Sequence, residues 1–191
     1  MKPRILAFAG STRTGSFNKK LIRVAAAAAQ AARAEVTLLD LRDIPMPIYD
    51  GDLEAREGIP PNAKKLKELM KSHHGLLLAC PEYNSSISGV LKNAIDWASR
   101  PMEGEEELEC FTGKVAALLS ASPGSLGGLR GLVTVRSILG SIGVLVLPEQ
   151  VAVPRAHEVF AEDASLKDAK RAAAIEKLAS KLTDTIRKLK S

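Results

Sequence analysis

Short runs of apolar residues alternate along the chain with longer segments in which apolar residues recur every three or four positions. The short runs are typical of buried strands and the longer segments of amphipathic helices. Strands are expected at five places: Ile5–Ala9, Glu35–Leu39, Gly75–Cys80, Val115–Leu119 and Val144–Leu147. Helices are expected at another five: Asn18–Ala32, Pro61–Ser72, Ser88–Ser99, Leu129–Ile142 and Leu166–Leu189.

Alternating strands and helices predict an α/β fold, in which a parallel sheet is covered by helices on both faces. The 191 residues show no repeat and no break in composition, so we expect a single domain spanning residues 1–191. In such sheets ligands bind beyond the carboxyl ends of the strands, where the strand order reverses. The loops at 10–18, 81–88 and 120–128 follow strands and are therefore the places to look for a site.

Composition narrows the range of functions. The net charge is +5, from 27 basic and 22 acidic residues, and much of the excess lies in the last expected helix. That helix also has an apolar stripe, so its lysines are most simply a solvated face. Aromatic residues make up only 4% of the chain, which leaves few stacking surfaces for a nucleic acid. No apolar run approaches the roughly 18 residues of a membrane helix.

The remaining composition points to no scaffold of disulfides and no metal. Cys80 and Cys110 are the only cysteines, and we expect them to be reduced thiols in a cytoplasmic protein. The three histidines are scattered and form no metal-ligand pattern. The acidic segment at 102–109 is expected to be a solvated insertion.

The loop at Gly10–Asn18 has the composition of an anion-binding site. It reads GSTRTGSFN, and it leaves a strand to enter a helix. The backbone N–H groups at the start of that helix, four hydroxyls and the charge of Arg13 match a phosphate monoester. The loop lacks both the lysine of a Walker loop and the G-x-G-x-x-G pattern of dinucleotide sites. An ordinary turn with Ser16 or Asn18 as the helix cap is the open alternative.

The loops at Pro81–Ser88 and Ser120–Gly128 complete the picture. In the first, Tyr83 offers a flat apolar face and Asn84 both a donor and an acceptor. The second is rich in glycine and serine, which allow the backbone to approach a ring closely. Each loop alone could be an ordinary polar loop. Together, at one edge of a parallel sheet, the three predict a site for a planar ring with a phosphate tail.

The same three segments carry a family resemblance. GSTRTGSFN at 10–18, PEYNSSISGVLKNAIDW at 81–97 and SASPGSLGGLRG at 120–131 are similar to the flavodoxin-like NAD(P)H-dependent FMN reductases, which include chromate, quinone and azo reductases. The likeness covers nearly the whole chain. It implies a flavodoxin-like three-layer sandwich with a five-stranded parallel sheet and helices on both faces. The chain departs from the pattern at Ser88, often a proline, and at Ser85 and Ser86, where bulkier side chains are common.

The resemblance also implies non-covalent FMN, with NADPH or NADH as co-substrate. It assigns FMN binding to residues of all three loops, namely Ser11, Arg13, Ser16, Phe17, Asn18, Pro81, Glu82, Tyr83, Asn84, Ser122 and Gly124. A hydride would pass to N5 of the flavin, and electrons would then leave to a quinone, an azo compound, chromate or free flavin in a ping-pong scheme. Because the flavin carries this chemistry, we expect no catalytic side chain.

The family is typically a homodimer or a homotetramer, with no membrane insertion. The helix at Gly89–Ser99, with Trp97 outside its core face, is a candidate interface element, although Trp97 could equally be a half-buried anchor. Polar contacts of Arg130 and Glu149 between subunits are a further possibility, with ordinary surface pairing favoured.

Two other functions are compatible with a flavin site. One is an electron-carrier flavodoxin, and the other is a flavin-binding protein without turnover. Carriers are usually strongly acidic, so the charge of +5 disfavours the first.

Overall fold

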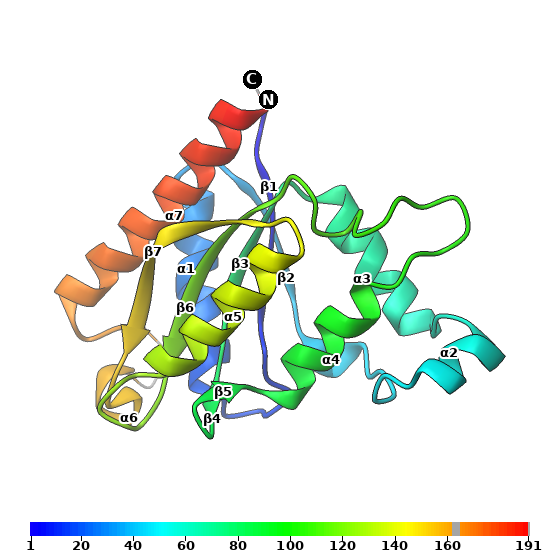
Figure 1. Ribbon diagram of the computed structural model, residues 1–191. Coiled ribbons are helices and arrows are strands. Elements are labelled where there is room, and N and C mark those ends of the chain that lie inside the picture. The colour runs from blue at the N-terminus through cyan, green and yellow to red at the C-terminus, as the bar shows by residue number, and fades with distance from the viewer. Residues whose placement is uncertain (162–164, 191) are drawn as a thin grey trace.

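The computed structural model describes residues 1–161 and 165–190, and a five-stranded parallel sheet forms its centre (Figure 1). From one edge to the other the strands are β2 (Glu35–Leu39), β1 (Arg4–Ala9), β3 (Gly75–Ala79), β6 (Val115–Ala121) and β7 (Leu145–Val153). Counted along the chain, this is the doubly wound order 2-1-3-4-5 of flavodoxin-like folds. The chain turns from one half of the sheet to the other between β1 and β3, so the loops that follow these strands flank the switch point.

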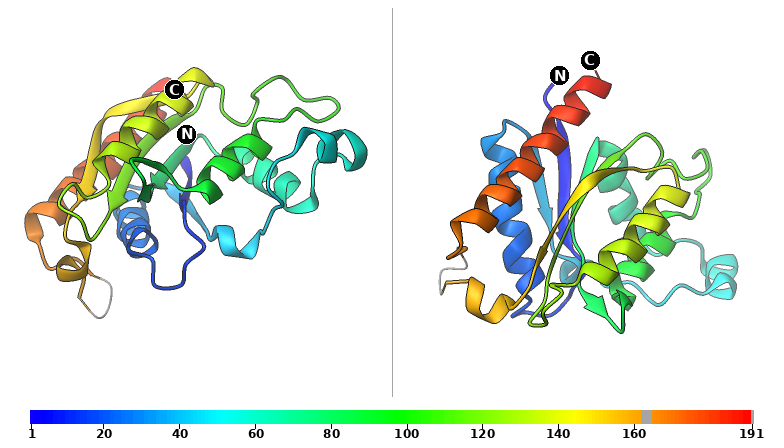
Figure 2. Two further views of the ribbon diagram at one scale, coloured as in Figure 1. Left: turned by 60° about the horizontal axis from the view of Figure 1, so that its bottom comes forward. Right: turned by 60° about the vertical axis from the view of Figure 1, so that its left-hand side comes forward.

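Helices cover both faces of the sheet, as the right-hand view of Figure 2 shows. The seven helices in the described residues are α1 (Phe17–Ala31), α2 (Gly51–Glu57), α3 (Pro61–Ser72), α4 (Gly89–Ala98), α5 (Leu129–Ser141), α6 (Ala156–Val159) and α7 (Ala169–Leu189). Alternate residues of β1 enter different cores: Ile5 packs with α1 and α7, and Leu6 packs with α3, α4 and α5. The expected three-layer α/β architecture is confirmed.

Two element boundaries differ from expectation by three residues or more. Strand β7 continues to Val153 instead of ending at Leu147, with Pro148 inside it. A proline is tolerated there because β7 is an edge strand whose outer N–H groups need no partner. Helix α7 begins at Ala169 rather than Leu166, because Asp168 caps it by accepting from the N–H of Arg171.

Trp97 is not the exposed or half-buried residue that its place on the helix suggested. Its side chain is fully buried, and its indole N–H donates to the carbonyl oxygen of Pro47 at 2.8 Å. Its ring meets that of Tyr49 edge to face, with 5.0 Å between centroids. Trp97 therefore anchors the segment after β2 within the chain and offers no surface to a second subunit.

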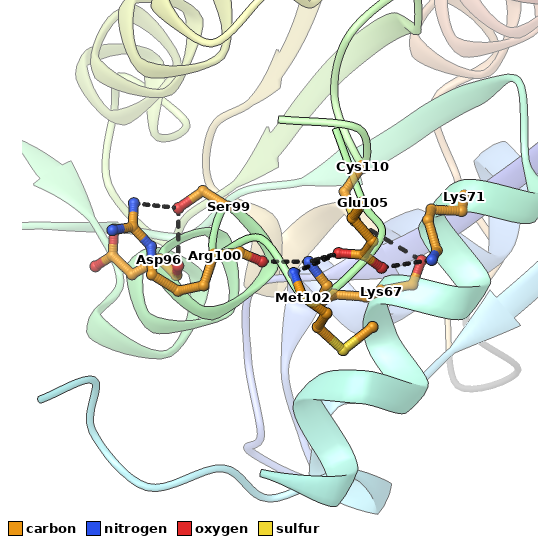
Figure 3. A network of polar contacts seen from close by, with 8 residues as sticks. All are labelled: Lys67, Lys71, Asp96, Ser99, Arg100, Met102, Glu105 and Cys110. Carbon is orange, nitrogen blue, oxygen red and sulfur yellow. Dashed lines mark hydrogen bonds and ion pairs between the residues drawn. The ribbon is translucent and has the colours of Figure 1, made fainter. Parts of the chain in front are cut away.

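The acidic segment after α4 is not a fully solvated insertion. Glu105 turns inward, where its carboxylate lies 2.7 Å from the ammonium of Lys67 and 2.5 Å from that of Lys71 (Figure 3). The side chain of Lys67 is 2% exposed and that of Glu105 is 6% exposed. Burial raises the pKa of Glu105, but hydrogen bonds from Lys67 and Lys71 outweigh it and lower the pKa to about 2. This ion-pair network fastens the segment to α3.

Lys67 also donates to the carbonyl oxygen of Arg100, just beyond the end of α4. The network thus joins α3, the acidic segment and the end of α4. No helix in the described part of the chain is long and apolar enough to cross a membrane.

Candidate functional site

A cavity of about 210 Å³ is lined by residues of all three loops. These loops lie at the lower edge of the sheet in Figure 1. The residues that line it are Ser11, Arg13, Ser16, Phe17, Asn18, Pro81, Glu82, Tyr83, Ala121, Ser122 and Pro123. Nine of the eleven expected site residues are therefore together. Asn84 and Gly124 do not line the cavity, and Ala121 and Pro123 were not expected there.

The first loop presents hydrogen-bond donors to the cavity. Ser16 caps α1, because its side-chain oxygen accepts from the N–H of Lys19. The N–H groups of Phe17 and Asn18 precede the first turn's own bonds, and no partner for them exists among the described residues. Arg13 is exposed beside them, and in the described structure its guanidinium donates a single hydrogen bond, 3.3 Å long, to the carbonyl of Gly15. Free N–H groups, a helix dipole and a cation suit a dianion.

The ring of Phe17 packs against a residue from the C-terminal part of the chain. Its ring stacks on that of Phe160, with 6.1 Å between centroids and 12° between planes. Phe160 follows the short helix α6 and is buried. No local signal in the sequence pairs these two rings, because they are far apart along the chain.

Asn18 acts as a strut between the first and third loops. Its side-chain amide donates to the carbonyl of Ala121 at 2.8 Å and accepts from the N–H of the same residue at 3.0 Å. The side chain is buried, and it both donates a hydrogen bond to Ala121 and accepts one from it. The backbone N–H of Asn18 is free for a ligand, and its side chain also holds the two loops together.

The second loop is a hairpin made of β4 (Glu82–Tyr83) and β5 (Ser86–Ile87). Its two turn residues, Asn84 and Ser85, have φ angles of 50° and 65°. Two successive left-handed residues are typical of the type I′ turn, whose twist matches that of a hairpin. The turn carries Asn84 to the tip, away from the cavity lining, and leaves Tyr83 57% exposed beside it.

Two serine hydroxyls tie the loops to one another. Ser88 caps α4 by accepting from Leu91, and it donates to the carbonyl of Gly10 at 2.6 Å. Ser120 donates to the carbonyl of Cys80 at 2.7 Å. Both bonds are buried, so the three loops are fixed relative to one another before any ligand arrives.

The third loop depends on glycine. Gly128 precedes α5 with φ of 88°, and a Cβ there would lie 1.9 Å from the hydroxyl of Ser120. Gly128 cannot cap α5 with a side chain, and the carboxylate of Glu82 performs that function from the hairpin instead.

Neither a thiolate at Cys80 nor a metal-ligand cluster is found in the described part of the chain. Burial raises the pKa of the Cys80 thiol to about 12, so it stays protonated. Over the described residues, no three side chains of His, Cys, Asp or Glu are grouped so as to hold a metal ion. Arg130 pairs with Glu82 and Glu149 with Lys181 inside this chain, as ordinary pairing predicted.

A larger hollow of about 710 Å³ lies between α1 and α7. Half of its ten lining residues are alanines, including Ala27, Ala28 and Ala31, and the lining contains no arginine or lysine. The cavity between the three loops is thus the better candidate for a polar ligand.

Comparison with known proteins gives this geometry its context. The model of the NADPH-dependent FMN reductase family matches residues 3–158, which is most of the chain. The chain belongs to this family. Counterparts within the family include an NAD(P)H-dependent FMN reductase of Pseudomonas aeruginosa, 35% identical over 188 residues, which cover 98% of this chain and 97% of that protein.

Other known proteins are also similar to this FMN reductase family member. A quinone reductase of Escherichia coli K12 is 34% identical over 146 residues, 76% of this chain and 74% of its own. A flavoenzyme NAD(P)H:(acceptor) oxidoreductase from Paracoccus denitrificans matches in structure with a TM-score of 0.82 and 32% identity, over 97% of this chain and 98% of that one. An archaeal flavodoxin, 8% identical with a TM-score of 0.64 over 96% and 99% of the two chains, shares the fold.

Proposed function

We propose that this protein binds FMN in the cavity between the three loops and uses it to oxidise NADPH or NADH and reduce quinones. One cavity is lined both by the start of α1, with its unpaired N–H groups and Arg13 beside it, and by Tyr83. This observation carries the proposal. A phosphate suits the first group and a planar ring suits the second. Membership of the FMN reductase family supports both assignments.

The residues present fit FMN in chemistry and in placement. The phosphate would accept from the hydroxyls of Ser11 and Ser16, from Arg13 and from the N–H groups at the start of α1. The ring would lie against the hairpin and the third loop, which contribute Pro81, Glu82, Tyr83, Asn84, Ser122 and Gly124. Of these, Asn84 and Gly124 would reach it only from the rim, because neither lines the cavity.

Bound FMN would supply two-electron chemistry, accepting a hydride from the nicotinamide and passing electrons on in a ping-pong scheme. The protein's own contribution is to hold the ring, to leave one face open and to direct backbone N–H groups at charge that forms on it. We expect that no side-chain acid or base is needed, because the flavin carries the chemistry.

We propose that the protein reduces a wider range of electron acceptors than the family name indicates. An open face beside an exposed Tyr83 would admit planar acceptors such as quinones, azo compounds and free flavin, and small oxidants such as chromate. We also propose a single FMN-binding domain that works in the cytoplasm as a homodimer or a homotetramer. Mass measurement by light scattering would decide the assembly.

The competing function is an electron-carrier flavodoxin. Such a carrier would bind FMN equally well but would not be reduced by a nicotinamide. The charge of +5 favours the enzyme, and so does the presence of a single aromatic residue, Tyr83, in the two loops assigned to the ring.

Anaerobic reduction separates the two functions. The purified protein is expected to bind one FMN per chain and to lose its yellow colour when NADPH or NADH is added. Turnover with a panel of quinones should then follow. Failure to bind FMN would refute the site, and bound FMN that neither nicotinamide reduces would favour the carrier.

A further inference from the structure

The carboxylate of Glu82 joins two walls of the cavity. Its oxygens accept from the backbone N–H groups of Arg130 at 3.0 Å and of Gly131 at 3.3 Å. The guanidinium of Arg130 contributes two more contacts of 2.9 Å. The side chain of Glu82 is only 9% exposed. Four donors from α5 thus converge on one carboxylate of the hairpin.

Helix α5 needs this partner because its own cap is missing. Gly128 has no side chain, and none fits, since a Cβ would meet Ser120. The first N–H groups of a helix have no partner inside it, and a carboxylate at this end both accepts from them and interacts favourably with the helix dipole. Glu82 fills the place of a capping residue from a position 48 residues away.

Backbone packing makes the same contact close. A Cβ on Gly131 would lie 3.2 Å from Cβ of Glu82 and 3.3 Å from its Cα. The hairpin and the helix therefore touch through their backbones at the glutamate itself. A change at Glu82 would shift the hairpin relative to the third loop.

We propose that Glu82 is a positioning residue for the flavin ring: its carboxylate binds α5 rather than the ring, and so sets the distance between the hairpin wall and the third-loop wall. The inference rests on the proposed function, since the ring is assigned to this cavity there. It replaces the direct cofactor contact expected of this side chain.

The charge of Glu82 has a second consequence. It balances both the guanidinium of Arg130 and the positive end of the α5 dipole at the cavity rim. Without it, two positive groups would stand uncompensated beside the ring. Reduced FMN carries more negative charge than oxidised FMN. Loss of the Glu82 carboxylate would therefore stabilise reduced FMN and raise the midpoint potential of the bound flavin.

Two substitutions separate the contact from the charge. Glu82→Gln keeps an oxygen for the N–H groups of α5 but removes the charge and the oxygen that accepts from the guanidinium of Arg130. Glu82→Ala removes both oxygens and the charge. Glu68→Gln is the matched control, because Glu68 is exposed on α3, away from the cavity. Each variant is assayed as apoprotein and with FMN.

In the apoprotein, amide exchange at Arg130 and Gly131 is expected to accelerate in Glu82→Ala. The dissociation constant of FMN should rise about tenfold or more in Glu82→Ala, the loss expected for hydrogen bonds to a charged group, and less in Glu82→Gln. The midpoint potential should rise in Glu82→Gln, and the control should match the wild type in all three measurements. If Glu82→Ala fails to fold, Glu82→Gln still tests the affinity and the potential.

Unchanged amide exchange at Arg130 and Gly131 in Glu82→Ala would overturn the positioning role. Unchanged FMN affinity and midpoint potential in Glu82→Gln would overturn it as well. A wild-type protein that binds no FMN would instead refute the proposed function, and the exchange measurement on apoprotein would still report the Glu82 contact.

Discussion

Replacing Glu105 by Gln tests whether the buried ion pairs hold the acidic segment in place. The substitution leaves the shape of the side chain nearly unchanged and removes the charge that faces Lys67 and Lys71. Lys67, which is 2% exposed, would keep its hydrogen bond to Arg100 but lose its counter-ion, whereas Lys71 is 27% exposed and can turn to water. Breaking a buried ion pair from one side costs about 3–5 kcal/mol.

Because Lys71 regains solvent and the glutamine keeps an oxygen, we expect the low end of that range, about 3 kcal/mol of unfolding free energy. For a chain of this size, the melting temperature would fall by roughly 6–12 °C. Urea unfolding of the apoprotein, followed by circular dichroism, measures the loss directly. Glu106→Gln is the matched control: Glu106 is the exposed neighbour and has no ion pair in the described structure, so its effect should stay within about 0.5 kcal/mol.

The difference between wild type and Glu105→Gln should also depend on pH. The pKa of Glu105 falls from 4.5 to about 2 on folding, so its stabilisation is complete above pH 4.5 and is lost as the pH falls toward 2. The difference should shrink by up to about 1.4 kcal/mol for each pH unit below 4.5. An equal loss in Glu106→Gln, or a difference that stays constant from pH 5.5 to 3.5, would refute the reasoning.

Three further predictions concern the loops of the cavity. Arg13→Ala should weaken FMN binding by about 1.5–3 kcal/mol, while Arg56→Ala on the exposed face of α2 should not; equal affinities in a fluorescence titration would place the phosphate elsewhere. Asn18→Ala should destabilise the apoprotein by about 1–3 kcal/mol, because the N–H and carbonyl of Ala121 lose their buried partner; an unchanged urea midpoint would contradict the strut. Ser85→Gly should raise stability by up to about 1 kcal/mol, since Ser85 has a φ of 65°, and a lower melting temperature would count against strain in that turn.

The five-stranded sheet and the five longer helices followed from the sequence because each has a local signature, whereas the short helices α2 and α6 and the hairpin strands β4 and β5 were not expected. The alternation of Ile5 and Leu6 between two cores, for example, reflects a strand buried on both faces. The edge strand β7 was harder, because Pro148 is a local stop signal that only its position in the sheet overrules. The start of α7 likewise depended on the cap at Asp168 rather than on the apolar pattern.

The cavity was also predictable as a place, since the carboxyl ends of parallel strands share one edge of a sheet. The roles of individual side chains were not. Asn18 bonds to a residue 103 positions away and Glu82 to one 48 positions away, and nothing local announces either contact. The inward turn of Glu105 was missed for the same reason: its lysine partners lie on a helix that precedes it by more than 30 residues.

The hydroxyl of Ser88 links the stability of a helix to the shape of the ligand pocket. It caps α4 and holds the end of β1 with the same oxygen, so fraying of the first turn of α4 would release the backbone at Gly10. In the intact fold this backbone is already in place, and its conformational entropy is lost during folding rather than on association. A ligand would then meet a rigid receptor, whose rate of capture is governed by diffusion and charge more than by rearrangement.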